Sequence, residues 1–500
     1  MVGPLVSRAA LDVLNGALED FTPDSVLALL GPVGQSALDR GDLLGAERMV
    51  GIDDGALSTL IRLFLLALPV PAQAARAALG LGPQDAPALL AESGGSVRAR
   101  LEVRPYAERD GPPWWVISDF GSDVRPGPLA ADHVLGIGAA SLNLAQLTAR
   151  TPVARALDVG TGCGIQALHL SRHADAVTAT DISARALAMA ATTAALSGTS
   201  WDLRAGSLLD PVVGERYDLV VANPPFVISP GLRPGHGGYD YRDSGVPGDA
   251  LCAGLVRGLP GVLAPGGTAQ LLANWAITAD TPWVERIEAW LAGSGCDAWV
   301  WQREIAGPAE YVSLWLRDAG ERPGSDRWRV RYAEWLDWMQ AAGIVAVGMG
   351  AITVWNTGRA DPVVTCEDVR HAVEQPAGAA IAAWLPRQHW LRDTSDAALL
   401  DARLRHAEDV VRTRSDLLGT QGWATEVEQV RLSRGMRWEL ETDEAIAGLI
   451  AACDGRTALR VPLTVLAAVN DVPLEAVADA VLPVVRDLVG RGFLLPEGLA

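Results

Sequence analysis

Lysine is absent from the 500 residues of this chain, so all 41 of its basic residues are arginines. Alanine, glycine and proline are abundant, a combination typical of GC-rich coding rather than of a functional constraint. Acidic residues outnumber arginines by 60 to 41, which gives a formal net charge of −19. Because affinity for phosphate depends on cationic contacts, this composition argues against a surface coated for non-specific nucleic-acid binding. It leaves room for a local arginine patch.

Cysteine is also scarce, and the five cysteines lie far apart in the chain. None forms a Cys-x-x-Cys pair, which argues against a zinc site or a disulfide framework. We expect free thiols in a reducing compartment and no bound metal. The five are Cys163, Cys252, Cys296, Cys366 and Cys453.

Long hydrophobic runs are missing as well. The most apolar segment, Leu63 to Ala75, has 13 uncharged residues between two arginines. A helix needs about 20 apolar residues to cross a bilayer. The N-terminus lacks the basic flank and apolar stretch of a secretory signal. We therefore expect a cytoplasmic protein without a membrane partner. Its size and its apolar content of 49% predict two to four soluble globular domains.

One stretch organises the chain, the apolar run from Tyr217 to Ala222 that ends at Asn-Pro-Pro-Phe, residues 223–226. The run has the length and β-branched content of a strand. Two prolines stop it, since proline donates no backbone hydrogen bond and Pro224 excludes Asn223 from the helical region. Asn223 is thus expected just past the carboxyl end of a strand, where open α/β sheets bind ligands. Alone, the stretch is also typical of a strand before a proline turn.

The residue types suit transfer of a group to a planar nitrogen, whose lone pair is delocalised. The Asn223 side-chain oxygen and a carbonyl of Pro224 or Pro225 can accept its two hydrogens and aim its lone pair. The ring of Phe226 can stack on the planar group. Positioning then supplies most of the rate without a strong base.

A second motif lies upstream, where a short apolar strand enters Gly160-Thr161-Gly162-Cys163-Gly164 and then a helix. Glycines permit a tight turn and a close approach of the backbone to a ligand. Asp181 follows Gly160 by 21 residues, at the end of another strand-like run. An acid at this spacing fits a ribose hydroxyl contact.

Together, Asp158-x-Gly-x-Gly-x-Gly and Asn-Pro-Pro-Phe resemble the class I S-adenosylmethionine-dependent methyltransferases, over roughly residues 130–320. Within that class the pair is similar to the subset that methylates planar nitrogens. This subset includes N6-adenine and N2-guanine nucleic-acid methyltransferases and release-factor glutamine methyltransferases. The resemblance implies S-adenosylmethionine as cofactor.

The resemblance also implies roles for individual residues. Asn223, Pro224, Pro225 and Phe226 would form the catalytic motif. The cofactor would contact Asp158, Gly160, Thr161, Gly162, Gly164, Ile165, Asp181, Ile182, Ser207, Leu208 and Asn223. One position departs from the pattern, because these families often carry an acid near the adenine where this chain has Ser207. Asp210 is the alternative for that contact.

The segments around the motifs alternate strand and helix, which predicts a parallel sheet. We expect an α/β fold with a seven-stranded Rossmann-like methyltransferase core at residues 126–357. Ile344 to Trp355 would be its antiparallel last strand, after two inserted helices. The glycine-rich loop from Gly231 to Gly248 leaves directly from the target motif. It is expected to be a substrate lid, with Tyr239 and Tyr241 as stacking partners, or else a disordered insertion.

Both ends of the chain are expected to be mainly helical and winged-helix-like, at residues 1–125 and 358–500. In the first, Val97 to Arg104 alternates as a half-buried strand, and Trp114 to Ser118 can pair with it. In the second, residues 427–432 and 436–440 can pair. There Arg403, Arg405, Arg412 and Arg414 interleave with acids, which favours a salt-bridged helix face.

The leading hypothesis is therefore an N-methyltransferase acting on an exocyclic amine of a ribosomal or transfer RNA base, with RNA, including ribosome-associated RNA, as its partner. One alternative is glutamine N5-methylation of a translation factor or another protein, which the acidic net charge favours. Another is a catalytically inactive binding scaffold, which the intact motifs disfavour. The oligomeric state cannot be read from the sequence.

Overall fold

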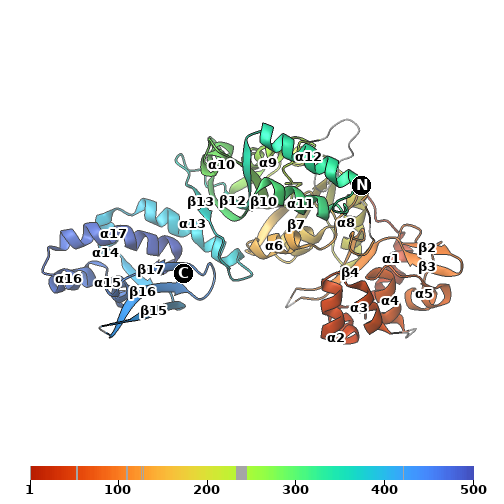
Figure 1. Cartoon of the computed structure of the whole chain (residues 1–500), viewed down its shortest axis with the longest axis horizontal. Coiled ribbons are helices and arrows are strands. Elements are labelled where there is room, and N and C mark those ends of the chain that lie inside the picture. The colour runs from red at the N-terminus through yellow and green to blue at the C-terminus, as the bar shows by residue number, and fades with distance from the viewer. Residues whose placement is uncertain are drawn as a thin grey trace. The chain divides into compact units, whose positions relative to one another are not determined.

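The computed structural model describes residues 2–51, 55–108, 111–125, 127, 129–231, 245–420 and 422–499. Its contacts divide the chain into two compact units, one of residues 1–145 and 151–369 and one of residues 146–150 and 370–500. Figure 1 labels the elements of both. Most of the predicted lid, including Tyr239 and Tyr241, lies outside the described residues. The predicted division into three domains stays a prediction.

A mixed eight-stranded sheet forms the centre of the first unit, in the order β13-β11-β12-β10-β9-β6-β7-β8. Strands β6 to β10 run parallel, and β12 is antiparallel to both of its neighbours. Its strands are β6 (Val153–Val159), β7 (Ala174–Asp181), β8 (Asp202–Ala205), β9 (Tyr217–Ala222), β10 (Leu263–Thr278), β11 (Asp297–Ala306), β12 (Ile344–Trp355) and β13 (Val364–Asp368).

The predicted α/β class and the antiparallel strand at 344–355 are confirmed. The predicted number of seven strands is wrong by one, because β13 pairs in parallel with β11 and extends the sheet. Its sequence, Val-Thr-Cys-Glu-Asp, is short, half-buried and polar, so it shows no strand periodicity. It also lies beyond residue 357, where the sheet was expected to end.

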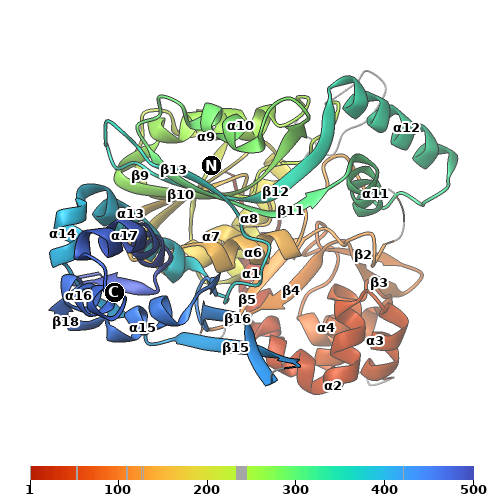
Figure 2. The same cartoon turned by 60° about the vertical axis from the view of Figure 1, so that its left-hand side comes forward.

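Helices cover both faces of this sheet, with α7 and α8 on one side and α9 and α10 on the other (Figure 2). Helix α8 begins as predicted at Ser183, whose hydroxyl accepts the Ala186 N–H at 3.2 Å. The two inserted helices are α11 and α12, which pack against each other between β11 and β12 in the chain. The helices are α6 (Ala139–Leu147), α7 (Ile165–Leu170), α8 (Ala184–Leu196), α9 (Ala250–Gly258), α10 (Trp283–Leu291), α11 (Pro308–Asp318) and α12 (Asp326–Ala341).

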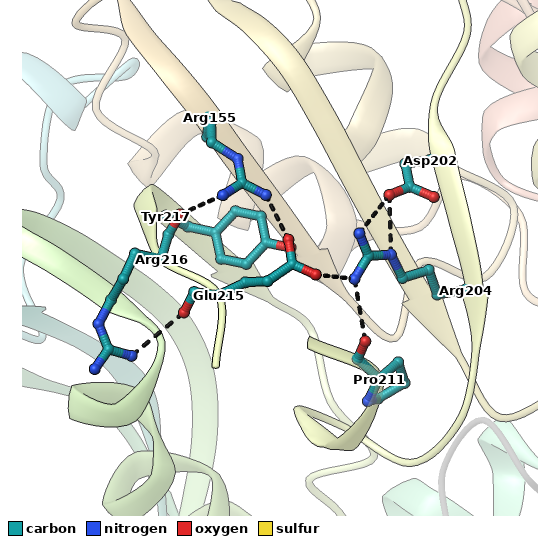
Figure 3. Close-up of polar contacts among 7 residues, drawn as sticks. All are labelled: Arg155, Asp202, Arg204, Pro211, Glu215, Arg216 and Tyr217. Carbon is teal, nitrogen blue, oxygen red and sulfur yellow. Dashed lines mark hydrogen bonds and ion pairs between the residues drawn. The ribbon is translucent and has the colours of Figure 1, made fainter. Parts of the chain in front are cut away.

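An ion-pair cluster joins β6, β8 and the chain just before β9 (Figure 3). Glu215, just before β9, lies between Arg155 of β6, at 2.5 Å, and Arg204 of β8. The hydrogen bonds from Arg204 and then Arg155 lower the pKa of Glu215 to about 2. The Arg155 guanidinium also stacks over the Tyr217 ring at 4.7 Å. These contacts tie β6 and β8 to the chain that enters β9.

The N-terminal segment shares a hydrophobic core with the sheet helices, since Leu14, Phe21 and Phe64 cluster with Met189 and Leu196 of α8. It contains a three-stranded sheet, β1-β3-β2, and a separate hairpin of β4 and β5. The elements are α1 (Arg8–Leu18), α2 (Pro23–Asp39), α3 (Leu43–Val50), α4 (Ala56–Phe64), β1 (Val70–Pro71), α5 (Ala72–Leu79), β2 (Leu90–Ser93), β3 (Ser96–Ala99), β4 (Glu102–Tyr106) and β5 (Trp114–Ser118).

Pairing of residues 114–118 with the preceding strand is confirmed. The single strand predicted at 97–104 is wrong, because the chain bends at residues 100 and 101 and passes from one sheet to the other. The winged-helix assignment of both chain ends stays a prediction.

The second unit contains two small sheets, β18-β14-β19 and β15-β16-β17. The predicted pairing of 427–432 with 436–440 is confirmed by β16 and β17. The predicted arginine-bearing helix face is wrong, because all four arginines lie on strands and Arg412 pairs with Glu428 across β15 and β16 at 2.6 Å. The elements are α13 (Gly378–Asp393), α14 (Asp396–Asp401), β14 (Arg403–His406), β15 (Val410–Gly419), β16 (Gly422–Leu432), β17 (Glu439–Glu441), α15 (Glu444–Ala452), β18 (Asp454–Ala458), α16 (Arg460–Val469), α17 (Leu474–Arg491) and β19 (Leu494–Pro496).

Candidate active site

Loops at the carboxyl ends of β6 to β9 surround a cavity of about 320 Å³. Most of the predicted cofactor residues line it, namely Gly160, Thr161, Gly162, Ile165, Asp181, Ile182, Ser207, Leu208 and Asn223, together with Pro225. Asp158 and Gly164 lie outside the lining. Residues to which the motifs give no role also line it, among them His133, Leu135, Gly136, Ser141, Gln166, Ser183 and Ala186.

Gly164 maintains the packing behind the glycine loop. Its φ is +88°, and an added Cβ would lie 2.6 Å from Cζ3 of Trp201. The Trp201 indole is itself held by a hydrogen bond from Nε1 to the Ser171 hydroxyl, at 2.9 Å. Glycine is therefore required here for a close approach of chain to ring, rather than for contact with a ligand.

Asp158 stabilises the glycine loop from its buried side. It is 1% exposed, and its Oδ2 accepts hydrogen bonds from the Thr161 hydroxyl at 2.7 Å and the Ala167 N–H at 3.2 Å. Burial raises the pKa of Asp158 to about 7, although both hydrogen bonds lower it. The nearby Asp181 carboxylate adds to the rise. Asp158 thus ties the turn to the start of α7.

This pKa predicts a pH-dependent stability. Folding raises the pKa from 3.8, so the folded state loses about 4 kcal/mol relative to the unfolded state as pH rises from 4 to 7. Asp158→Asn removes this titration. The quantity to compare is the Tm of the variant minus the Tm of wild type. We expect this difference to be several degrees larger at pH 8 than at pH 5. Any constant cost of the amide cancels in this difference. The exposed Asp175→Asn is the control, and an equal change at both pH values would contradict the role.

Asp181 ends β7 and faces the same cavity. Its Oδ2 accepts the Gly162 N–H at 2.9 Å, and its Oδ1 accepts the Ser183 N–H at 2.8 Å. Carboxylate oxygens accept more than one hydrogen bond each, which suits contact with a ligand hydroxyl. The Asp181 carboxylate therefore both fixes the glycine loop and faces the cavity with its acceptor oxygens.

Ser207 and Leu208 form the wall after β8. Leu208 has a φ of +45°, and its carbonyl accepts the Thr180 hydroxyl at 3.1 Å. Of the two alternatives for the missing acid, Ser207 lines the cavity, whereas Asp210 lies outside it at the start of a short 3₁₀ helix.

Asn223 lies on the wall that this cavity shares with a second one, of about 450 Å³. Pro224 and Phe226 line the second cavity, and the Phe226 ring meets Trp315 of α11 edge to face at 5.9 Å. The Asn223 Oδ1 is buried and has no hydrogen-bond partner among the described residues. A buried acceptor without a donor costs free energy, so this oxygen is suited to a donor that a ligand brings.

The two cavities also share the segment from His133 to Ser141. Asp119, next to β5, accepts the Val134 N–H at 2.8 Å and both terminal nitrogens of Arg185 at 2.5 Å. Burial raises the pKa of Asp119, but these hydrogen bonds outweigh it and hold the pKa below its usual value. Burial lowers the pKa of His133, which favours a neutral imidazole. Asp119, which follows the β4–β5 hairpin, thus positions the segment from His133 to Ser141 that lines both cavities.

Helix α11 anchors the chain just after Phe226. The Tyr311 hydroxyl accepts hydrogen bonds from the Ile228 N–H at 2.9 Å and from Asn274 Nδ2 at 2.8 Å. Trp335 of α12 donates to the Ile228 carbonyl at 3.0 Å. The inserted helices therefore hold the backbone that carries the target motif.

Tyr311→Phe leaves both of these buried donors unpaired. We expect the free energy of unfolding to fall by about 2–4 kcal/mol. Urea denaturation measures the stability. Tyr332→Phe on α12 is the matched control, because its half-buried ring stacks on Trp328 and its hydroxyl has no partner among described residues. Equal losses in both variants would contradict the anchoring role.

Within the described part of the chain, no cluster of three or more histidine, cysteine or acidic side chains is arranged to hold a metal ion. A search of the same residues finds no helix long and apolar enough to span a bilayer.

Comparison with known proteins identifies a methyltransferase small domain at residues 133–232. The motif-based resemblance is thereby confirmed. Residues 19–100 and 382–496 match two families described only as domains of unknown function, DUF7059 and DUF7782.

Curated relatives match the same part of the chain. Ribosomal RNA small subunit methyltransferase C of Cronobacter sakazakii is 33% identical over 26% of this chain and 38% of its own length. Release factor glutamine methyltransferase of Xylella fastidiosa is 38% identical over 24% of this chain and 47% of its own length. A solved structure of a 16S rRNA methyltransferase from T. thermophilus, bound to AdoMet and guanosine, is 17% identical. The match covers 52% of this chain and 66% of that chain, with a TM-score of 0.27. The chain thus spans less than half the length of these curated relatives.

Proposed function

We propose that this chain transfers the methyl group of S-adenosylmethionine to a planar nitrogen. The observation that carries the proposal is the unpartnered, buried Asn223 Oδ1 on the wall between two cavities. One cavity has the glycine loop and carboxylate that suit a nucleoside cofactor, and the other has an aromatic corner that suits a planar group. Asn223 is the residue of the target motif that reaches both.

The residues of the first cavity fit the cofactor. Asp181 offers acceptors for the ribose hydroxyls, and Gly160 and Gly162 leave room for the methionine part. Leu208 supplies an apolar wall for the adenine, with Ser207 as its polar neighbour. When bound, S-adenosylmethionine supplies an electrophilic methyl group on a positively charged sulfur.

In the second cavity, Asn223 Oδ1 and a carbonyl of the Pro-Pro pair accept the two hydrogens of the target nitrogen. These hydrogen bonds favour a tetrahedral nitrogen and direct its lone pair through the shared wall. Phe226 stacks on the planar group, and the Tyr311 anchor holds the motif in place. Positioning of this kind accounts for most of the acceleration.

The acceptor we propose is an exocyclic amine of a ribosomal or transfer RNA base. The edge-to-face pair of Phe226 and Trp315 is suited to a flat aromatic group. The second candidate is a protein glutamine, because the second cavity has acidic walls, with Glu102, Asp119 and Asp318 among them. Both acceptors occur in the names of the relatives. The unpaired cysteines suit a cytoplasmic setting.

Transfer of labelled methyl from S-adenosylmethionine tests the proposal, with purified protein and an extract from cells that lack it. We expect label that nuclease releases. Label that only protease releases would favour glutamine. Absence of label together with absence of cofactor binding, measured by calorimetry, would overturn the enzyme in favour of a scaffold.

A further inference from the structure

The second cavity, lined by Pro224 and Phe226, is the target cavity of the proposed function. Another hollow lies beside it, on the turn between α11 and α12. Its volume is about 730 Å³, and three arginines line it, Arg317, Arg322 and Arg327. All three are exposed. In a chain with a net charge of −19, three arginines around one hollow are a local reversal of charge.

Two of these arginines are available to a ligand. The side chains of Arg317 and Arg322 make no hydrogen bond or ion pair with any described residue. Arg327 is partly neutralised by Glu321, whose Oε1 lies 3.5 Å from its Nε. Glu321 is 4% exposed and also pairs with Arg331, so it is the buried support of the hollow rather than part of its open surface.

The arginine hollow adjoins the target cavity, although no residue lines both. The same two chain segments border both, because Asp123 and Asp318 line the target cavity while Ser122 and Arg317 line the hollow. The segments touch, since an added Cβ on Gly320 would lie 2.3 Å from the Gly127 carbonyl oxygen. An RNA chain with its base in the target cavity would pass over this contact to reach the arginines.

The signs of charge divide along this path. Four carboxylates and one guanidinium line the target cavity, namely Glu102, Asp119, Asp123 and Asp318 against Arg104. Arg104 pairs with Glu102 at 2.6 Å and Arg185 pairs with Asp119 at 2.5 Å, so this lining offers a phosphate no unpaired arginine. Its carboxylate oxygens can accept hydrogen bonds from an uncharged base. The neighbouring hollow has the opposite preference, because guanidinium groups bind phosphate oxygens in bidentate fashion.

From this division we propose that the hollow holds the phosphate backbone of a single-stranded RNA whose target base occupies the neighbouring cavity. The proposal deepens the function proposed above and rests on it. It names RNA as the acceptor class and places the nucleotide adjacent to the target base at Arg317 and Arg322. An acidic protein segment is the competing occupant and becomes an outcome of the test.

The test compares Arg317→Gln/Arg322→Gln with wild type in binding a fluorescein-labelled single-stranded RNA oligonucleotide of mixed sequence, by fluorescence anisotropy at several salt concentrations. Loss of two phosphate contacts on a single strand lowers the slope of log affinity against log salt by about 1.4 and the affinity by about tenfold near 0.1 M salt. Arg48→Gln/Arg257→Gln removes two other exposed arginines without partners among described residues, and we expect wild-type binding. Cofactor affinity is expected to be the same in all three proteins.

Three outcomes would overturn the assignment: equal binding by the hollow variant and wild type, an equal loss in the control, or absence of RNA binding by wild type. If RNA does not bind and the hollow variant instead loses transfer to a protein acceptor, an acidic protein segment occupies the hollow. None of these outcomes removes methyl transfer itself. Failure of the proposed function would appear separately, as a wild-type protein that binds no cofactor and labels no acceptor.

Discussion

Asn223→Ala is expected to lower kcat for methyl transfer by about 100- to 1,000-fold, the usual effect of removing one preorganised hydrogen-bonding group at a reacting centre. The dissociation constant for S-adenosylmethionine should change by less than about threefold, because the asparagine forms only part of one cavity wall. Single-turnover transfer of labelled methyl measures the first quantity, and isothermal titration calorimetry measures the second.

Two further variants sharpen this test. Asn223→Asp keeps an acceptor oxygen of the same shape, so it should retain more transfer than the alanine variant. Asn143→Ala replaces an exposed asparagine on α6 and should behave as wild type. A parallel loss of cofactor binding and turnover in Asn223→Ala would contradict its role at the target nitrogen.

Asp181→Ala is expected to weaken cofactor binding by about 100-fold, because two charge-assisted hydrogen bonds to ribose hydroxyls are lost. The same change releases the Gly162 and Ser183 N–H groups, which the carboxylate now accepts. At saturating cofactor, kcat should fall much less than affinity, since the target motif is untouched. Calorimetry measures the affinity, and initial rates at rising cofactor concentration separate KM from kcat.

Asp175→Ala gives the matched control for this variant. Asp175 lies near the amino end of the same strand, β7, and is exposed. Its replacement should leave cofactor affinity unchanged. Unchanged affinity in Asp181→Ala as well would remove the carboxylate from the ribose.

Local sequence was sufficient to predict the centre of the sheet. Strands β6, β7 and β9 contain apolar runs that end in loops lining the cavity, so Gly160, Asp181 and Asn223 mark three strand ends in the sequence itself. The edge strand β13 was missed, because a half-buried edge strand needs little apolar content. The bend between β3 and β4 was also missed, since strict alternation continues through it while the hydrogen-bond partners change.

The site was predictable only where one short stretch determines it. The cofactor loop and the target motif are contiguous, so their residues were found together. Trp315, Asp318 and Asp119 come from an inserted helix and from a hairpin before the core, and tertiary packing brings them to Asn223. His133 is a single residue without a spacing pattern, so no motif in the sequence assigns it a role.

The walls of the target cavity have a consequence for how such proteins diversify. The part of the chain that matches other methyltransferases, residues 133–232, contains the cofactor loop and Asn223. Much of the opposite wall, including Glu102, Asp119 and Trp315, lies outside that stretch. For the function proposed above, mutation of these flanking segments would alter the acceptor cavity and leave the cofactor loop unchanged.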